Sequence, residues 1–228
     1  MLKTLYHGEP LTKGLLRASA ETGRATSLSS LRIPPHFRWG RYQAVWSAIS
    51  EEYSQYALRI LQWLTFSARP LSIDEVAEVV AIDVKRDPAF DHNEILSEPL
   101  DALNICSSVV IITVDNDNKW EDSPSRIVAL AHYSVKEYLV SDRIWTGKAA
   151  KYGMRDNACH DAIARSCLGY LLQFQQLELD LECLSTFRLA RYSAEFWISH
   201  TQKTGEQTEE TDQIAIRLCS KKSSANVN

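Results

Sequence analysis

Hydrophobic residues recur at helical spacing in the first half of the chain, and the pattern predicts successive helices. In residues 51–67 the apolar positions follow one another at intervals of three and four, on a face broad enough to be buried on more than one side. Pro70 ends this helix, because the residue before a proline is disfavoured in the helical region. Ser72 and Glu75 then have the spacing of a capping box, which predicts a second helix over 72–80.

The next segments predict a third helix, a hairpin and a fourth helix. Residues 94–106 have one apolar helical face. A β-branched run at 109–114 and an apolar run at 126–131 flank a long polar loop, which is typical of a hairpin. Ser134 and Glu137 have the spacing of a second capping box, so we expect a short helix to begin there. Three helices and a hairpin in this order are the plan of a winged-helix domain.

Beyond the hairpin the pattern predicts two longer amphipathic helices, over 157–175 and 189–200. The stretch between them fits either a short helix or an extended link. The chain is therefore predicted to be mainly α with a small β-hairpin, a winged-helix domain followed by a helical extension. The predicted boundaries are a poorly ordered basic leader over 1–41, the winged helix over 42–145, the extension over 146–200, and a polar linker and tail over 201–228.

Composition narrows the class of protein. The chain has 228 residues, 45% of them hydrophobic, and a formal net charge of −4, so it can build a core and carries no global attraction for nucleic acid or an anionic membrane. Its apolar runs are too short to span a bilayer, and its first residues do not resemble a signal peptide. The five cysteines form no CxxC pair, which favours reduced thiols. We expect a cytoplasmic protein.

Three segments of the sequence match cofactor- or metal-binding motifs only in part, and we expect no cofactor or metal at any of them. Residues 146–148 (TGK) lack the upstream glycine of a phosphate loop. The acidic loop before residue 120 has the alternation of a calcium loop, but Trp120 stands where the turn glycine belongs. Cys159 and Cys167 lie two turns apart on one helix face while His160 points about 100° away, so they predict buried thiols rather than a zinc site.

A catalytic histidine and serine pair is the sharpest enzymatic hypothesis, and the sequence argues against it. His132 could act as a base toward Ser134, but Ser134 is already assigned to the helix cap and the chain has no GxSxG elbow. We expect His132 to be a hydrogen-bonded residue that ties the hairpin to the following helix. The chain is therefore predicted not to be an enzyme.

Charge on the two elements that would read DNA indicates a different partner. The predicted recognition helix at 94–106 has three acidic residues and no lysine or arginine, and in the loop at 115–125 four acidic residues face Lys119 alone. Phosphates would repel both elements, since DNA readers use phosphate contacts to fix their register. We predict that this face docks protein instead, through Glu94, Glu98, Asp101, Asp115, Asp117, Glu121 and Asp122.

Four strings in the chain resemble a known family in their order and content: residues 56–83, 126–144, 158–174 and 189–200. They are similar to the segment that follows the NACHT ATPase in fungal STAND proteins, NLR-like receptors in which ankyrin repeats usually come next. The winged-helix module of that segment is named after an inositol deacylase of glycolipid anchors, a label that implies a hydrolase. The resemblance covers roughly residues 42–200, and the ATPase core and the repeats are missing from this chain.

The resemblance implies a regulatory adaptor. In such switches the winged helix packs on the nucleotide-bound ATPase and holds it closed until nucleotide exchange releases it. We therefore expect a non-catalytic interaction module, a fragment or shortened relative, with a NACHT ATPase domain as its partner in cis or in trans. Three other hypotheses stay open: a glycolipid or ester hydrolase, a DNA-binding winged-helix regulator, and a gene remnant without function.

Overall fold

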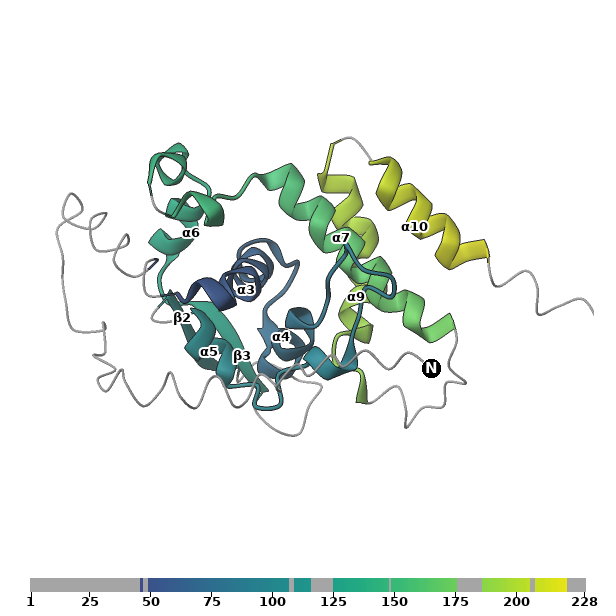
Figure 1. The fold of residues 1–228 in the computed structure, drawn as a ribbon, viewed down its shortest axis with the longest axis horizontal. Coiled ribbons are helices and arrows are strands. Elements are labelled where there is room, and N and C mark those ends of the chain that lie inside the picture. Colours follow the sequence, from purple (N-terminus) through teal and green to yellow (C-terminus); the bar gives the residue numbers. More distant parts are fainter. Residues whose placement is uncertain are drawn as a thin grey trace, which may run out of the picture.

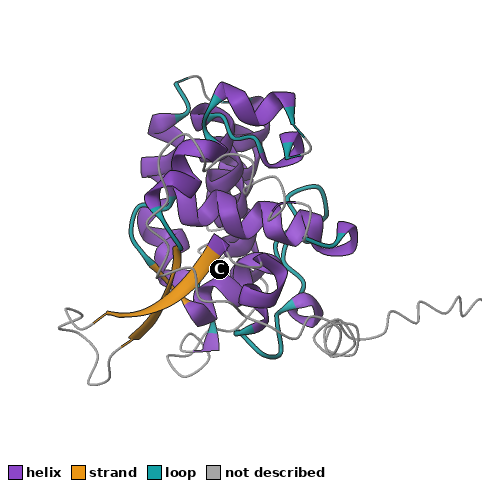
Figure 2. Ribbon diagram, turned by 90° about the vertical axis from the view of Figure 1, so that its left-hand side faces the viewer, coloured by secondary structure: helices purple, strands orange, loops and turns teal. Residues whose placement is uncertain are grey.

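Helices dominate the fold, with a small antiparallel sheet at one end (Figures 1 and 2). The structure is a computed structural model, and it describes residues 46, 49–106, 109–115, 125–147, 149–175, 186–205 and 208–220. The first half contains η3 (Glu51–Tyr53), α3 (Ser54–Phe66), β1 (Leu71–Ser72), α4 (Ile73–Val80), η4 (His92–Glu94), α5 (Asp101–Cys106), β2 (Val110–Asp115), β3 (Ser125–Leu130) and α6 (Tyr133–Leu139). The second half contains η6 (Asp142–Thr146), η7 (Ala150–Tyr152), α7 (Asp156–Leu172), η8 (Gln173–Gln175), α9 (Ala190–Lys203) and α10 (Glu209–Ser220).

The α3 helix lies at the centre of the core, as its broad apolar face predicts. Ile60 and Leu61 are fully buried and Trp63 is 1% exposed, so the helix is covered on more than one side. Helices α4 and α5 pack against it from the winged-helix half and α7 from the extension. The fold class predicted from the sequence, a winged helix with a helical extension, is confirmed.

The sheet has three strands in the order β1-β3-β2, all antiparallel. Six pairs join β2 to β3, from Val110 opposite Leu130 to Asp115 opposite Ser125, which confirms the predicted hairpin. The two-residue strand β1 was not predicted. It pairs Leu71 with Val128, and it is too short to leave a periodic pattern in the sequence.

The predicted helix over 94–106 is wrong in its first half. Glu94 ends the short η4, and the α-helix begins only at Asp101. Pro99 explains the difference, because a proline disfavours helix in the residue before it and has no N–H to donate. The new helix starts from that turn, where Asp101 donates its N–H to the Glu98 carbonyl (2.9 Å).

The two predicted capping boxes have different outcomes. At α4 the box is present: the Glu75 N–H donates to Ser72 Oγ (3.1 Å), and the Ser72 N–H donates to Glu75 Oε2 (2.8 Å). The box predicted for Ser134 and Glu137 is wrong, because α6 begins two residues earlier than that box requires, at Tyr133, and its N-cap is His132. The Ser134 N–H donates to His132 Nδ1 (3.1 Å), so the imidazole caps the helix.

The polar segment after residue 200 is not a linker throughout, which corrects the prediction for 201–228. Helix α9 continues to Lys203, and α10 then packs along α7 (Figure 1). Polar side chains make much of this contact: the hydroxyls of Thr208 and Thr211 both donate to Asp161 Oδ1 (2.8 Å each). The helix also has a short apolar side, on which Ile214 and Leu218 are partly buried, but polar residues dominate its sequence and led to the prediction of a linker. The residues predicted as a leader, 1–41, lie outside the described residues.

Replacing the imidazole cap tests how α6 begins. His132→Ala removes the acceptor of the Ser134 N–H, and we expect the free energy of unfolding to fall by about 1 kcal/mol, as for other N-cap deletions. Glu137→Ala is the matched control, since Glu137 is exposed and has no role in this cap. Urea denaturation of both variants measures the effect. An equal loss in the two variants would restore the Ser134 and Glu137 box.

Candidate functional site

The acidic docking residues predicted from the sequence are divided by the structure into three groups. Glu94 is neutralised, because Arg86 grips its carboxylate with two nitrogens (2.6 and 3.1 Å). Glu98 is exposed, and Asp101 at the start of α5 is half-buried and accepts from Asn104 (3.0 Å). The remaining predicted residues are Asp115, which ends β2, and Asp117, Glu121 and Asp122, which lie outside the described residues.

The same elements also expose apolar side chains. Leu100 before α5 is 43% exposed, and Ile111 and Val114 on β2 are 41% and 54% exposed. The described part of the segment 95–106 has no basic side chain, while Arg126 on β3 is exposed opposite Val114. We call the segment Ser97–Cys106 with β2 the α5 face. An acidic surface interrupted by apolar side chains has the composition of a protein interface more than that of a phosphate-binding surface.

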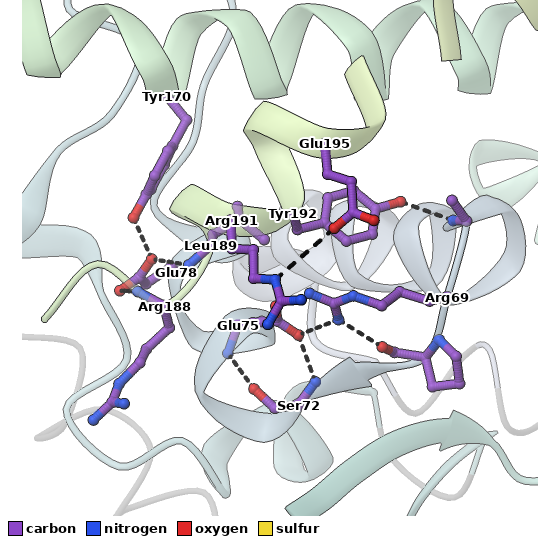
Figure 3. A network of polar contacts seen from close by, with 12 residues as sticks. Arg69, Ser72, Glu75, Glu78, Tyr170, Arg188, Leu189, Arg191, Tyr192 and Glu195 are labelled. Atoms are coloured by element: carbon purple, nitrogen blue, oxygen red, sulfur yellow. Dashed lines mark hydrogen bonds and ion pairs between the residues drawn. The ribbon is translucent and has the colours of Figure 1, made fainter. Parts of the chain in front are cut away.

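A buried carboxylate joins the winged helix to the helical extension. Glu78 on α4 is 4% exposed and accepts three hydrogen bonds: from the Tyr170 hydroxyl (2.5 Å), the Arg188 N–H (2.9 Å) and the Leu189 N–H (2.9 Å). Figure 3 shows these donors converging from α7 and from the turn before α9. Burial and the adjacent Glu78 raise the pKa of Tyr170, which keeps its hydroxyl protonated as a donor.

A second contact of α4 stiffens the turn that leads into it. The Glu75 carboxylate caps its own helix at Ser72 and also pairs with Arg69 through two bonds of 2.6 and 2.9 Å (Figure 3). The Arg69 guanidinium lies 5.1 Å from the ring centroid of Tyr192 on α9. The α3–α4 turn and α9 are therefore held together by one connected group of charged and aromatic side chains.

Tyr192 begins a chain of hydrogen bonds through two buried histidines. Its hydroxyl oxygen accepts from the Ala68 N–H (2.8 Å) and lies 2.9 Å from His200 Nε2. His200 Nδ1 lies 2.8 Å from His160 Nδ1. We assign the Tyr192 hydroxyl as the donor to His200 Nε2, because its oxygen already accepts from the Ala68 N–H; with this assignment His200 donates from Nδ1 to His160 Nδ1. This order fixes the tautomers and leaves His160 with its proton on Nε2.

Both histidines of this hydrogen-bond chain, His160 and His200, are neutral near pH 7. Burial, followed by the nearby His160 and Lys203, lowers the pKa of His200 to about 4. Burial also lowers the pKa of His160, against the opposing effect of Asp156. Protonating His160 at Nδ1 would set two N–H groups against each other across 2.8 Å, so the hydrogen-bond chain needs the neutral forms.

The thiols and histidine that imitate a zinc site do not form one. Cys159 and Cys167 are buried free thiols, as predicted, and burial raises their pKa to about 11 and about 12. His160 turns away from them toward His200 and the Phe66 ring. Within the described ranges, no three histidine, cysteine, aspartate or glutamate side chains come together as metal ligands.

The histidine and serine considered for catalysis are used at the helix start. His132 Nδ1 accepts from the Ser134 N–H and lies 2.7 Å from Ser134 Oγ, and Ser134 is 2% exposed. A serine so deeply buried presents no oxygen to a substrate. The predicted structural role of His132, tying the hairpin to α6, is confirmed.

Sequence reasoning missed the residues that join the two halves: Glu78, Tyr192 and His200. The donors to Glu78 lie 92 or more positions away, Ala68 lies 124 positions from Tyr192, and His160 lies 40 positions from His200. No local pattern connects residues so far apart. One local signal was available. Glu78 is a lone charge between Val76-Ala77 and Val79-Val80, and a carboxylate on an apolar helix stretch requires donors from elsewhere.

The arrangement of α3, α4, α5 and the hairpin defines a winged helix, and comparison with known proteins agrees. Residues 46–155 match the family model described as GPI inositol-deacylase, winged helix domain, so this part of the chain is a winged-helix domain of that type. The chain is 33% identical over 181 residues to azaphilone pigments biosynthesis cluster protein L of Monascus ruber. That alignment covers 78% of this chain and 37% of the Monascus protein.

No solved structure matches the chain. Among the described residues, no helix combines the length and the apolar character that crossing a bilayer would require.

The buried carboxylate gives the first prediction for this region. Glu78→Gln replaces a carboxylate with an amide that has one acceptor oxygen for three donors, so we expect the free energy of unfolding to fall by about 3 kcal/mol. Glu52→Gln, at an exposed glutamate, should change it by less than about 0.5 kcal/mol. Urea denaturation measures both. Equal midpoints for the two variants would show that the Glu78 contacts contribute nothing.

The histidine chain predicts a loss of stability in mild acid. The unfolded chain protonates His200 near pH 6.5 and the folded chain only near pH 4, so the unfolded state binds more protons between these values. The free energy of unfolding should therefore fall by up to about 2 kcal/mol from pH 7 to pH 5. His200→Gln should flatten this slope, whereas His92→Gln, at an exposed histidine, should keep it. A slope unchanged in His200→Gln contradicts the assignment.

Proposed function

We propose that this chain is a non-catalytic interaction module that docks a protein partner through the α5 face. The observation that carries the proposal is the composition of these elements: exposed Glu98, half-buried Asp101, exposed Leu100, and one exposed apolar side chain on each face of β2, Ile111 and Val114. In a winged helix this surface is the one that would enter DNA. Negative charge there opposes phosphate, and exposed apolar area favours burial against protein.

The partner we propose is the ATPase domain of a NACHT-type STAND protein, in cis in relatives and in trans for this chain. The support is the resemblance of residues 42–200 to the segment that follows such ATPases, together with the family match of residues 46–155. In this role the module binds the nucleotide-loaded ATPase, holds it closed and is released by nucleotide exchange. The proposed location is the cytoplasm, where such ATPases act.

A hydrolase is the alternative that the name of the matched family suggests, and the geometry gives it no site. His132 and Ser134 are the pair that it would use, and both are engaged at the start of α6 with the serine buried. A DNA-binding regulator is the alternative that the fold suggests. It would have to press Glu98 and Asp101 against phosphates without basic compensation in the described part of 95–106.

Calorimetric titration of the full chain with a NACHT ATPase domain from the same genome tests the proposal. We expect binding that weakens as salt rises from 50 to 300 mM, because the contact is electrostatic in part. The double variant Glu98→Lys/Asp101→Asn should weaken binding about ten-fold or more. The matched control is Glu209→Lys/Asp212→Asn, which changes the charge equally at two exposed residues of α10.

Two results would overturn the proposal. Absence of binding at 50 mM salt, with the ATPase in both its ADP and ATP states, removes the NACHT partner. A gel shift of random duplex DNA at low salt that the Glu98→Lys variant strengthens would assign the α5 face to nucleic acid instead.

A further inference from the structure

A cleft of about 600 Å³ lies where the winged helix meets the helical extension, and no role proposed above uses it. Its wall is built by five segments: the end of α3, α6, η6, the first turn of α7 and the end of α9. None of these segments belongs to the α5 face. A cavity of this size at the boundary of two structural units is typical of small-molecule sites.

Three cations from three different elements line this cleft. Lys136 comes from α6, Arg155 from the start of α7 and Lys203 from the end of α9, and all three are exposed. None forms an ion pair with a carboxylate in the part of the chain that the structure describes; Lys136 and Arg155 instead lie over the rings of Phe66 (5.9 Å) and Trp145 (5.3 Å). Unpaired cations held around one hollow attract an anion.

Two carboxylates line the same cleft, Asp142 and Asp156, and both are exposed. The Asp156 side chain is 67% exposed, so water screens its charge. Three cations against two carboxylates leave one net positive charge, which favours an anionic ligand. The amino end of α7, which opens on the cleft, adds partial positive charge of the same sign.

Trp145 lines the cleft with an aromatic ring that approaches the backbone of a glycine closely on one side and the Arg155 guanidinium on another. The ring is 42% exposed. It rests on the backbone of Gly153, where a Cβ atom would lie 2.8 Å from the ring carbons Cη2 and Cζ2. No other residue type leaves the ring in this place. An exposed indole beside cations favours a ligand that carries a ring as well as a charge.

A buried imidazole lines the cleft, and its Nε2 has no hydrogen-bond acceptor among the residues that the structure describes. His160 is 5% exposed and lines the cleft. With the tautomers assigned above for Tyr192, His200 and His160, the His160 proton is on Nε2. The nearest carboxylate oxygen, Asp156 Oδ1, lies 3.9 Å from Nε2, which is too far for a hydrogen bond. In this assignment His160 Nδ1 accepts from His200, and the His160 Nε2–H can donate to a ligand in the cleft.

We propose that this cleft binds a small organic anion, a carboxylate or phosphate monoester attached to an aromatic ring. The anionic group accepts from His160 Nε2 and pairs with Lys136 and Lys203, and the ring lies against Trp145. Because Lys136 belongs to the winged helix while His160 and Lys203 belong to the extension, a bound ligand ties the two halves together and raises the stability of the chain.

Titration of the full chain with 1-naphthyl phosphate and with 1-naphthoate tests the site and separates the two anionic groups. We expect saturable binding of at least one of them by calorimetry, with inorganic phosphate and 1-naphthol each binding at least ten-fold more weakly. The thermal unfolding midpoint should rise with the concentration of the bound compound.

Variants locate the binding. Lys136→Met/Lys203→Met should weaken it at least ten-fold, whereas Lys85→Met, at an exposed lysine outside the cleft, should leave it unchanged. Gly153→Ala displaces the Trp145 ring without a change in charge, so it should weaken the naphthyl compounds and leave the weaker binding of inorganic phosphate as it was. Circular dichroism confirms that each variant is folded.

Either of two outcomes overturns the proposal. One is the absence of binding of both naphthyl compounds at 5 mM to the folded chain. The other is binding that the double lysine variant and Gly153→Ala both leave unchanged, which would place the compounds elsewhere. Neither outcome bears on the docking of protein at the α5 face.

Discussion

A carboxylate buried among apolar residues must be satisfied by donors, and this requirement joins the two halves of the molecule. Glu78 lies on a helix of the winged-helix domain, yet its three donors all come from the extension. If α7 and the turn before α9 moved away, the carboxylate would lose its three donors and the apolar side chains packed at this junction would be exposed to water, which is costly. The extension is therefore part of the same structural unit rather than an appendage.

This junction also determines where function can reside. Within the described residues, the extension lies on the α4 side, and α5 and the hairpin strands lie at the opposite end (Figures 1 and 2). The cleft between α6, α7 and α9 exists only because the two halves are held in register. Its donor is oriented through Tyr192 and His200, which belong to the same junction. The two sites that we propose, one for protein at the α5 face and one for a small anion in the cleft, therefore lie in different parts of this unit.

Local patterns predicted the local parts of the structure. The spacing of apolar residues located α3, α7 and α9, and the Ser72 capping box located the start of α4, because each involves residues only a few positions apart. Two of the predictions that were wrong also rest on local rules, and in each case a second local effect was stronger. At α5 Pro99 prevails over helical spacing, and at α6 an imidazole takes the cap from a serine.

What the sequence could not predict depends on contacts between distant residues. Three contacts of this kind are the hydrogen bonds to Glu78, the pair of His160 and His200, and the bond from Thr211 to Asp161. In each, the partners lie 40 or more positions apart, so no local pattern connects them. The acidity of the α5 face could be read from composition alone. The arrangement of these acidic residues could not be predicted. Arg86 pairs with Glu94 and neutralises its charge, and this pairing depends on how the chain turns after α4.

Native-state hydrogen exchange tests most directly whether the two halves are one unit. The amides of Arg188 and Leu189 donate to Glu78. We predict that they exchange with the same opening free energy as the amide of Ile60 in the central α3 helix. Exchange of Arg188 and Leu189 through a cheaper opening, while Ile60 stays protected, would contradict it and show that the extension detaches from an intact winged helix.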